Sequence, residues 1–170
     1  MAVTVTVEDG SIVSGANSLV TTAEIDEWVL TNPHDTTWTA LSAAAKNGYA
    51  VMACRVMLEQ MDWDGWQTDA DQALDLPRSG MVDKNGNAID SDEIPTDIKN
   101  AQCEMARLLA KSDRTADPDT LGFSHIGVGS ISLDINKSDR PQVLPDSVYQ
   151  MIRWYGRKIN PRGIAQVIRA

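Results

Sequence analysis

The sequence has few of the residues from which most catalytic and metal sites are built. Its 170 residues include two cysteines, two histidines and one phenylalanine. Cys54 and Cys103 lie far apart in apolar patterns, and His34 and His125 lie in separate polar stretches. These positions match neither a zinc-ligand spacing nor a catalytic triad. We therefore expect two buried free cysteines, a reducing compartment, and a protein that is not an enzyme and has no cofactor or metal.

Other signals are absent as well. The sequence contains no GxGxxG, Walker A or GxSxG motif. No apolar run approaches the roughly 20 residues that span a bilayer. The N-terminus has neither the basic nor the apolar region of a signal peptide. We expect a protein without membrane contact that is made in the cytoplasm.

Positive charge is scarce over most of the chain. The sequence has 15 basic and 24 acidic residues, which gives a net charge of -9. Residues 151–170 contain five bases and no acid, so residues 1–150 contain 10 bases and 24 acids, a charge of -14. An acidic protein is poorly suited to binding nucleic acid through its phosphates. The basic C-terminal segment is a separate feature that requires its own explanation.

Apolar spacing predicts a mainly α fold. The elements expected are helices over 21–30, 42–61, 95–112 and 145–155, a strand over 3–7, and one or two strands over 126–135. A capping-box pattern marks the first helix at Thr21 and Glu24, and Gly156 is the expected C-cap of the last. We predict a compact bundle of about four helices with a small β element and an extended C-terminal tail.

Residues 62–95 interrupt the helical pattern and are rich in Asp, Gly and Pro. We expect an ordered excursion with a small hairpin at 83–87. Trp63 and Trp66 could be stacking platforms for single-stranded nucleic acid, but the acidic surroundings favour a role in packing the excursion onto the helices. Four nearby aspartates favour a solvated loop over a catalytic pair, and the hairpin favours an Asn-Gly turn over a calcium loop. These aspartates are Asp62, Asp64, Asp69 and Asp71.

The C-terminal tail, residues 157–170, combines bases with spaced apolar residues. Such a segment is typical of docking onto a partner protein, with apolar anchors in a groove and bases on acidic neighbours. A disordered end and a last helix folded back on the domain are the alternatives. The residues predicted to dock are Arg157, Lys158, Ile159, Arg162, Ile164, Val167, Ile168 and Arg169.

Several motifs together resemble one family of phage proteins. They are the Gly15-Ala-Asn-Ser-Leu-Val segment with Thr-Thr-Ala-Glu, the Trp63-Asp-Gly-Trp segment continuing to Pro77-Arg-Ser-Gly, and Asp92-Glu-Ile-Pro before a helix. Over about residues 5–155 the chain resembles the head-to-tail connector proteins of tailed phages, also called adaptor or neck proteins. The same group is often labelled DnaT-like single-stranded-DNA-binding. The segments Ile126–Leu133 and Leu144–Val148 resemble a strand and the last helix of such connectors.

The resemblance implies a structural virion protein without catalytic activity. Connector subunits form a ring, usually twelvefold, beneath the portal, and a tail-completion protein or nozzle binds the other face. Double-stranded DNA passes through the lumen during packaging and ejection. On this reading residues 1–156 form the connector domain, and residues 157–170 dock on the portal. Ring or tail contacts would involve the excursion at Trp63, Trp66, Arg78, Asp83 and Lys84.

The negative charge of residues 1–150 agrees with a channel through which DNA slides, because an acidic wall repels phosphates. A single-stranded-DNA-binding replication protein is the alternative function.

Overall fold

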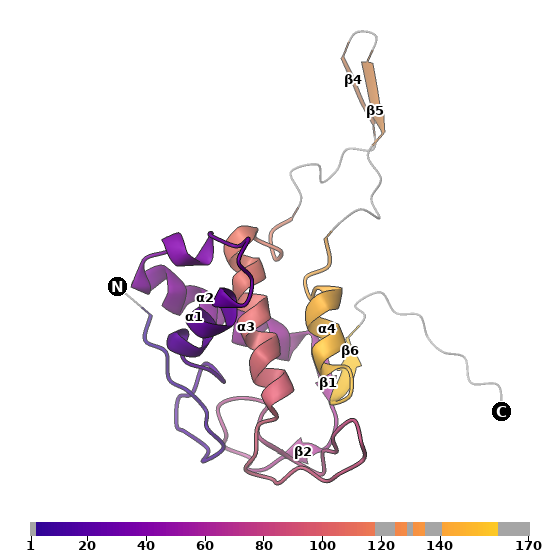
Figure 1. The fold of residues 1–170 in the computed structure, drawn as a ribbon. Helices are drawn as coiled ribbons and strands as arrows, with labels where there is room; N and C mark the ends of the chain where they lie inside the picture. Colours follow the sequence, from indigo (N-terminus) through magenta and orange to yellow (C-terminus); the bar gives the residue numbers. More distant parts are fainter. Residues whose placement is uncertain (1–2, 118–124, 129–130, 135–140, 160–170) are drawn as a thin grey trace, which may run out of the picture.

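The computed structural model of the chain describes residues 3–117, 125–128, 131–134 and 141–159. Within these residues the fold is mainly α-helical, as predicted, with small two-stranded sheets (Figure 1). The helices are α1 (Thr22–Leu30), the 3₁₀ helix η1 (Trp38–Ala40), α2 (Ala43–Glu59), α3 (Thr96–Lys111) and α4 (Asp146–Ile152). The strands are β1 (Met61–Trp63), β2 (Trp66–Gln67), β3 (Arg78–Ser79), β4 (His125–Val128), β5 (Ile131–Asp134) and β6 (Gly156–Lys158).

Helix α3 lies at the centre of the helical body and packs against α1, α2 and α4 (Figure 1). Its buried residues Ile98, Ala101, Met105 and Leu109 follow three- and four-residue steps, which places them along one side of the helix. Three other helices cover this central helix, so even Gln102, Cys103 and Glu104 are buried there. The core is therefore organised around α3.

Local signals in the sequence locate the helix starts correctly. Thr21 and Glu24 form the predicted capping box, in which the Thr21 hydroxyl accepts from the Glu24 N–H and Glu24 accepts from the Thr21 N–H. Ser42 caps α2 by accepting a hydrogen bond from the Ala45 N–H. These side chains satisfy N–H groups that have no partner inside the helix.

Strand pairing holds the end of the described chain, residues 156–158, against the start of the excursion. Strands β1 and β6 pair antiparallel, with Asp62 opposite Arg157 and Trp63 opposite Gly156. Gly156 is required by close approach, since a Cβ there would lie 2.5 Å from the Asp62 carbonyl oxygen. The expectation of a Gly156 helix cap is wrong, because α4 ends at Ile152 with Arg153 as its C-cap.

Two other strand expectations have different outcomes. The pair β4–β5 confirms the strands predicted over 126–135. The strand predicted over residues 3–7 is wrong, since among the described residues this segment makes a single parallel bridge, Val7 to Ser18. Alternation alone does not make a strand here, because the segment lies beside a loop that offers it no second strand.

The excursion 62–95 is ordered, as predicted, and four of its apolar side chains enter the core. They are Trp63, Leu76, Met81 and Ile94. The turn at Asp83 is also confirmed: the Asp83 N–H donates to the Asn87 carbonyl at 2.9 Å, and Val82 bridges Ala88. Asp83 Oδ1 accepts from the N–H groups of Asn85 and Asn87, which fixes the turn from within.

Gln102 on α3 joins three parts of the fold through one fully buried side chain. Its Oε1 accepts from the Leu19 N–H at 2.8 Å. Its Nε2 donates to Ser18 Oγ at 2.6 Å and to the Ala50 carbonyl at 3.0 Å. Loop, α2 and α3 are therefore held together by polar groups that have no access to water.

Replacing Gln102 with Leu should lower the free energy of unfolding by about 3 kcal/mol. It leaves the buried Leu19 N–H without its partner and removes the hydrogen bonds to Ser18 Oγ and to the Ala50 carbonyl. Urea denaturation measures the change. Gln150→Leu on the exposed side of α4 is the matched control and should stay within about 0.5 kcal/mol of the parent. Equal stability of the two variants would contradict the role assigned to Gln102.

Candidate functional site

The exterior of the described chain is strongly acidic. Among the described residues, 14 acidic side chains are exposed, against five basic ones. The exposed bases are Arg55, Lys84, Lys111, Arg153 and Arg157. The exposed acids are Asp9, Glu24, Glu27, Glu59, Asp62, Asp64, Asp69, Asp71, Asp90, Asp92, Glu93, Asp113, Asp117 and Asp146. Such a surface repels phosphate over most of its area.

Two of the exposed bases lie close together in sequence at the end of α4 and in β6. The Arg153 guanidinium lies 4.7 Å from the ring centroid of Trp154, which is 48% exposed. Arg157 is exposed in β6, and Ile159 just after this strand is 46% exposed. These four residues give the end of the described chain both positive charge and exposed apolar surface, and the exposed Asp62 lies opposite Arg157 in the strand pair.

The residues predicted to dock on a partner divide into three groups. Arg157 and Ile159 are exposed, while the Lys158 Nζ points into the chain and donates to the Leu144 carbonyl at 2.8 Å and to Gln142 Oε1. Burial lowers the pKa of Lys158. The others, Arg162, Ile164, Val167, Ile168 and Arg169, lie outside the described residues. Residues 157–159 are thus part of the folded body through the pairing of β6 with β1.

The two tryptophans of the excursion differ from each other. Trp63 is buried, and its indole N–H donates to the Leu58 carbonyl, so its predicted role in packing the excursion is confirmed. For Trp66 that prediction is wrong, because this side chain is 66% exposed on β2. Its ring lies over Gly80, where a Cβ would come within 2.6 Å of it. Trp66 packs on the excursion itself and presents its other surface to solvent.

The other excursion residues predicted to make ring or tail contacts, Arg78, Asp83 and Lys84, differ in exposure and in hydrogen bonding. Arg78 donates from Nε to the Asp64 carbonyl at 2.9 Å and from NH2 to the Gly65 carbonyl at 2.7 Å, which ties the β1–β2 turn to β3. Lys84 is exposed at the hairpin tip. Asp83 is engaged in the turn, and its hydrogen bonds from Asn87 lower its pKa. Of these three side chains, that of Lys84 is exposed, whereas those of Arg78 and Asp83 are half-buried.

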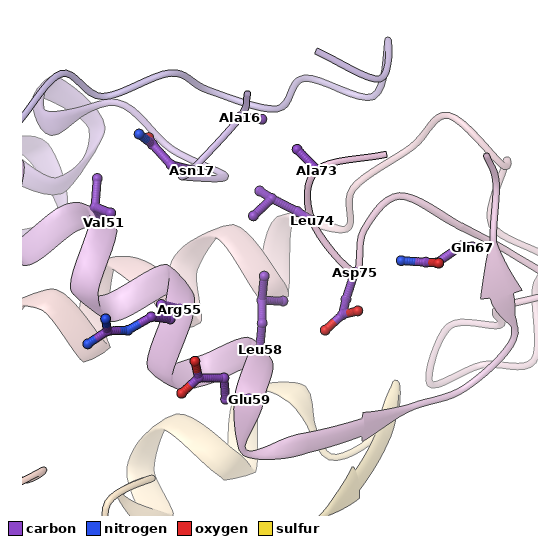
Figure 2. Close-up of a pocket in the computed structure, with 10 residues that line it drawn as sticks. All are labelled: Ala16, Asn17, Val51, Arg55, Leu58, Glu59, Gln67, Ala73, Leu74 and Asp75. Carbon is purple, nitrogen blue, oxygen red and sulfur yellow. The ribbon is translucent and has the colours of Figure 1, made fainter. Parts of the chain in front are cut away.

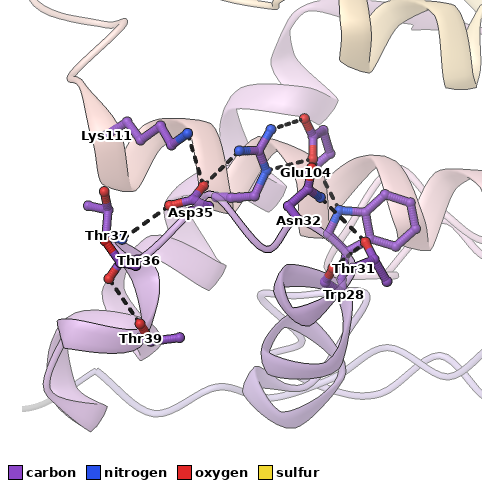
Figure 3. A network of polar contacts seen from close by, with 10 residues as sticks. Trp28, Thr31, Asn32, Asp35, Thr36, Thr37, Thr39, Glu104 and Lys111 are labelled. Carbon is purple, nitrogen blue, oxygen red and sulfur yellow. Dashed lines mark hydrogen bonds and ion pairs between the residues drawn. The ribbon is translucent and has the colours of Figure 1, made fainter.

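A partly buried ionic network is the strongest candidate for chemistry by residue type (Figure 3). Arg107 NH1 lies 2.7 Å from Asp35 Oδ2, and its NH2 contacts Glu104 Oε1 at 2.5 Å. Lys111 contacts the same Asp35 oxygen at 3.1 Å, and the Trp28 indole N–H donates to Glu104 Oε2. Every charged member has an opposite charge beside it, which is the arrangement of a structural network.

Metal and thiol chemistry find no support in the described part of the chain. No group of three or more His, Cys, Asp or Glu side chains there could hold a metal ion. Cys54 and Cys103 are buried and free, as predicted, and burial raises the pKa of each thiol to about 12. Thiols with such pKa values are poor nucleophiles at neutral pH.

A hollow of about 340 Å³ lies beside the C-terminal half of α2 (Figure 2). Its walls come from α2, from the loop at 16–17, and from Gln67 and residues 73–75 of the excursion. Apolar side chains such as Val51, Leu58 and Leu74 line it together with three charged ones, Arg55, Glu59 and Asp75. We call it the α2 groove.

Sequence reasoning missed both the α2 groove and the exposure of Trp154. The groove could not be found by pattern, since it joins segments that are far apart in sequence. Trp154 had a usable signal, because it lies off the buried stripe Val148, Ile152 and Tyr155 of the C-terminal helix region.

The Asp35 network predicts a pH dependence of stability. Burial alone would raise the pKa of Asp35, but hydrogen bonds from Arg107 and Lys111 outweigh it and hold the pKa below its usual value. A depressed pKa in the folded state adds stability above about pH 4, the unfolded value, and that stability is lost as pH falls through the folded pKa.

Asp35→Asn should lower the free energy of unfolding by about 2 kcal/mol at pH 7 and should lose less stability than the parent between pH 5 and pH 3. Urea denaturation at several pH values measures both effects. Glu27→Gln, on the exposed side of α1, serves as the control. A pH profile of Asp35→Asn identical to that of the parent would contradict the argument.

In the part of the chain that the structure describes, no helix has the length and apolar character needed to cross a membrane.

Comparisons with known proteins give one match. No curated protein and no solved structure matches the chain. Residues 3–155 match the sequence model of a family described as "Putative DnaT-like ssDNA binding protein". Because the match covers most of the chain, the protein belongs to this DnaT-like family.

Proposed function

We propose that this protein is a structural subunit of a phage head-to-tail connector, which forms a ring beneath the portal and continues the DNA channel toward the tail. The observation that carries the proposal is the excess of exposed acids over exposed bases, 14 against five in the described residues. A wall of this charge lets DNA slide without binding it. The Trp63–Gly80 and Asp92–Pro95 segments resemble connector proteins, and this resemblance is the reason for proposing a connector in particular.

The basic C-terminal segment supplies the contact with the portal in this proposal. Strand β6 fixes its start on the folded body, and residues 160–170 then carry two more bases and three branched aliphatic residues. Apolar anchors flanked by bases suit an acidic protein partner. The tail-side partner, a tail-completion protein or nozzle, would contact the other face of the ring.

The pairing of β6 with β1 determines where the chain can be shortened in a test. Ending the chain after Ile159 retains the whole of β6, whereas ending it after Gly156 removes two of its three residues. Truncation after Ile159 therefore tests the docking role while leaving the strand β6 intact. The chain that ends at Ile159 should still fold and should unfold in a single cooperative transition in urea.

We expect the chain ending at Ile159 to lose co-sedimentation with the portal protein. The double variant Arg162→Glu/Arg169→Glu should bind at least about tenfold more weakly, since it reverses the charge of the docking segment. Arg162→Lys/Arg169→Lys is the matched control and should bind as the parent does. Unchanged co-sedimentation of the truncated chain would refute the docking role.

Binding of single-stranded DNA is the second candidate function, and the description of the family favours it. The structural observation in its favour is the exposure of Trp66 and Trp154, the latter with Arg153 on its ring. Exposed aromatic rings beside arginine are typical of base-stacking surfaces. Trp66, however, lies in an excursion whose exposed charges are mostly acidic, with Asp64 and Asp69 close in sequence.

Fluorescence anisotropy with a labelled oligothymidine distinguishes the two functions. The connector proposal predicts no salt-sensitive binding at micromolar protein. Micromolar binding that weakens about tenfold in Trp154→Ala, as the loss of one stacked base would produce, would instead establish the second function. Leu30→Ala, which also removes an exposed apolar side chain, is the control.

A further inference from the structure

The α2 groove is an uncovered apolar hollow with mixed charge at its edges. Leu58 is buried at its base, while Val51 and Leu74 are half-buried and retain surface that faces the hollow (Figure 2). Its volume of about 340 Å³ is within the range of about 300 to 1,000 Å³ found for sites that bind small ligands. Covering this surface would be favourable, because apolar area would leave water.

The described chain ends close to this groove. The Ile159 N–H donates to the Gln60 carbonyl at 2.9 Å, and Gln60 is the C-cap of α2. Leu58 and Glu59, the two residues before it, line the groove. Eleven residues follow Ile159, and an extended chain of that length spans up to about 36 Å. The segment can therefore reach the whole groove of its own subunit.

The chemistry of this segment matches the groove. Ile164, Val167 and Ile168 are spaced by three and four residues, so they would lie on one side of a helical turn. Arg162 and Arg169 flank them. The groove offers apolar walls with the carboxylates of Glu59 and Asp75 and one guanidinium, that of Arg55.

We propose that residues 160–170 occupy the α2 groove of their own chain in the free protein, with the aliphatic side chains inserted between α2 and the 73–75 segment. The contact concerns the free subunit and does not depend on the portal or on DNA. It makes the groove the site at which the basic C-terminal segment is held when no partner is bound.

Photo-crosslinking of the full chain tests the proposal directly. Benzoylphenylalanine replaces Gln67, an exposed residue that lines the groove, and in a control chain it replaces the exposed Leu30 on α1. After irradiation, trypsin cleaves at Arg162 and Arg169 and releases the peptide 163–169. We expect this peptide on the groove probe and not on the control probe.

Mixing isotopically light and heavy chains before irradiation identifies the donor of the segment. Crosslinks within one isotope class support the proposal, and mixed crosslinks would overturn it in favour of a second copy. Crosslinks from the groove probe only to other parts of the chain, or no crosslink at all, would also overturn it. Binding to the portal could fail or succeed independently, because these measurements use the free protein.

A protease-protection assay gives a second readout in the full chain. Ala73→Trp fills the groove from its exposed edge, while Ala70→Trp, in the same loop, does not line it. Trypsin should cut after Arg162 about tenfold faster in Ala73→Trp than in the parent, because the segment is released. Cutting after Lys84 on the exposed hairpin reports on the fold. Equal cutting at Arg162 in both variants and the parent would overturn the proposal.

Discussion

Burial of α3 on several sides is the constraint on which the rest of this structure depends. A helix covered by α1, α2 and α4 must satisfy every polar side chain that it carries into the core. Gln102 does this through the 16–20 loop and α2, and Glu104 does it through Arg107 and the Trp28 indole. These contacts fix the positions of α1 and α2 as well as that of α3, so a polar position in one helix determines how several segments pack.

A second consequence concerns the C-terminus. Because α4 packs on α3 and is followed by β6, the chain is brought back to β1 at the start of the excursion. The basic residues Arg153 and Arg157 are thereby held on a body whose other exposed charges are mostly acidic. Arg157 lies opposite the exposed Asp62 in the β1–β6 pair, so a base and an acid are neighbours at this position. In the proposed connector the acidic exterior would face DNA, and the basic C-terminal segment would contact a protein partner.

Much of the fold could be predicted from the sequence, because the helices follow local rules. The capping residues Thr21 and Ser42 and the apolar stripe of α3 place three helices almost to the residue. The expectations that were wrong concern contacts between segments that lie far apart in the sequence. Residues 3–7 alternate like a strand but pair at one position, and Gly156 is needed by the β1 backbone and not by a helix end. The exposure of Trp66 was missed because its packing surface is Gly80, whose lack of a side chain gives no hydrophobic signal.

We propose above that this DnaT-like family member forms a ring beneath a portal, with an acidic wall facing DNA. Electron microscopy of the protein mixed with portal assemblies tests it most directly, since projection images show added density and its symmetry at once. The account predicts a ring coaxial with the portal and a continuous central channel. Portal assemblies that show no added density at micromolar protein would contradict it.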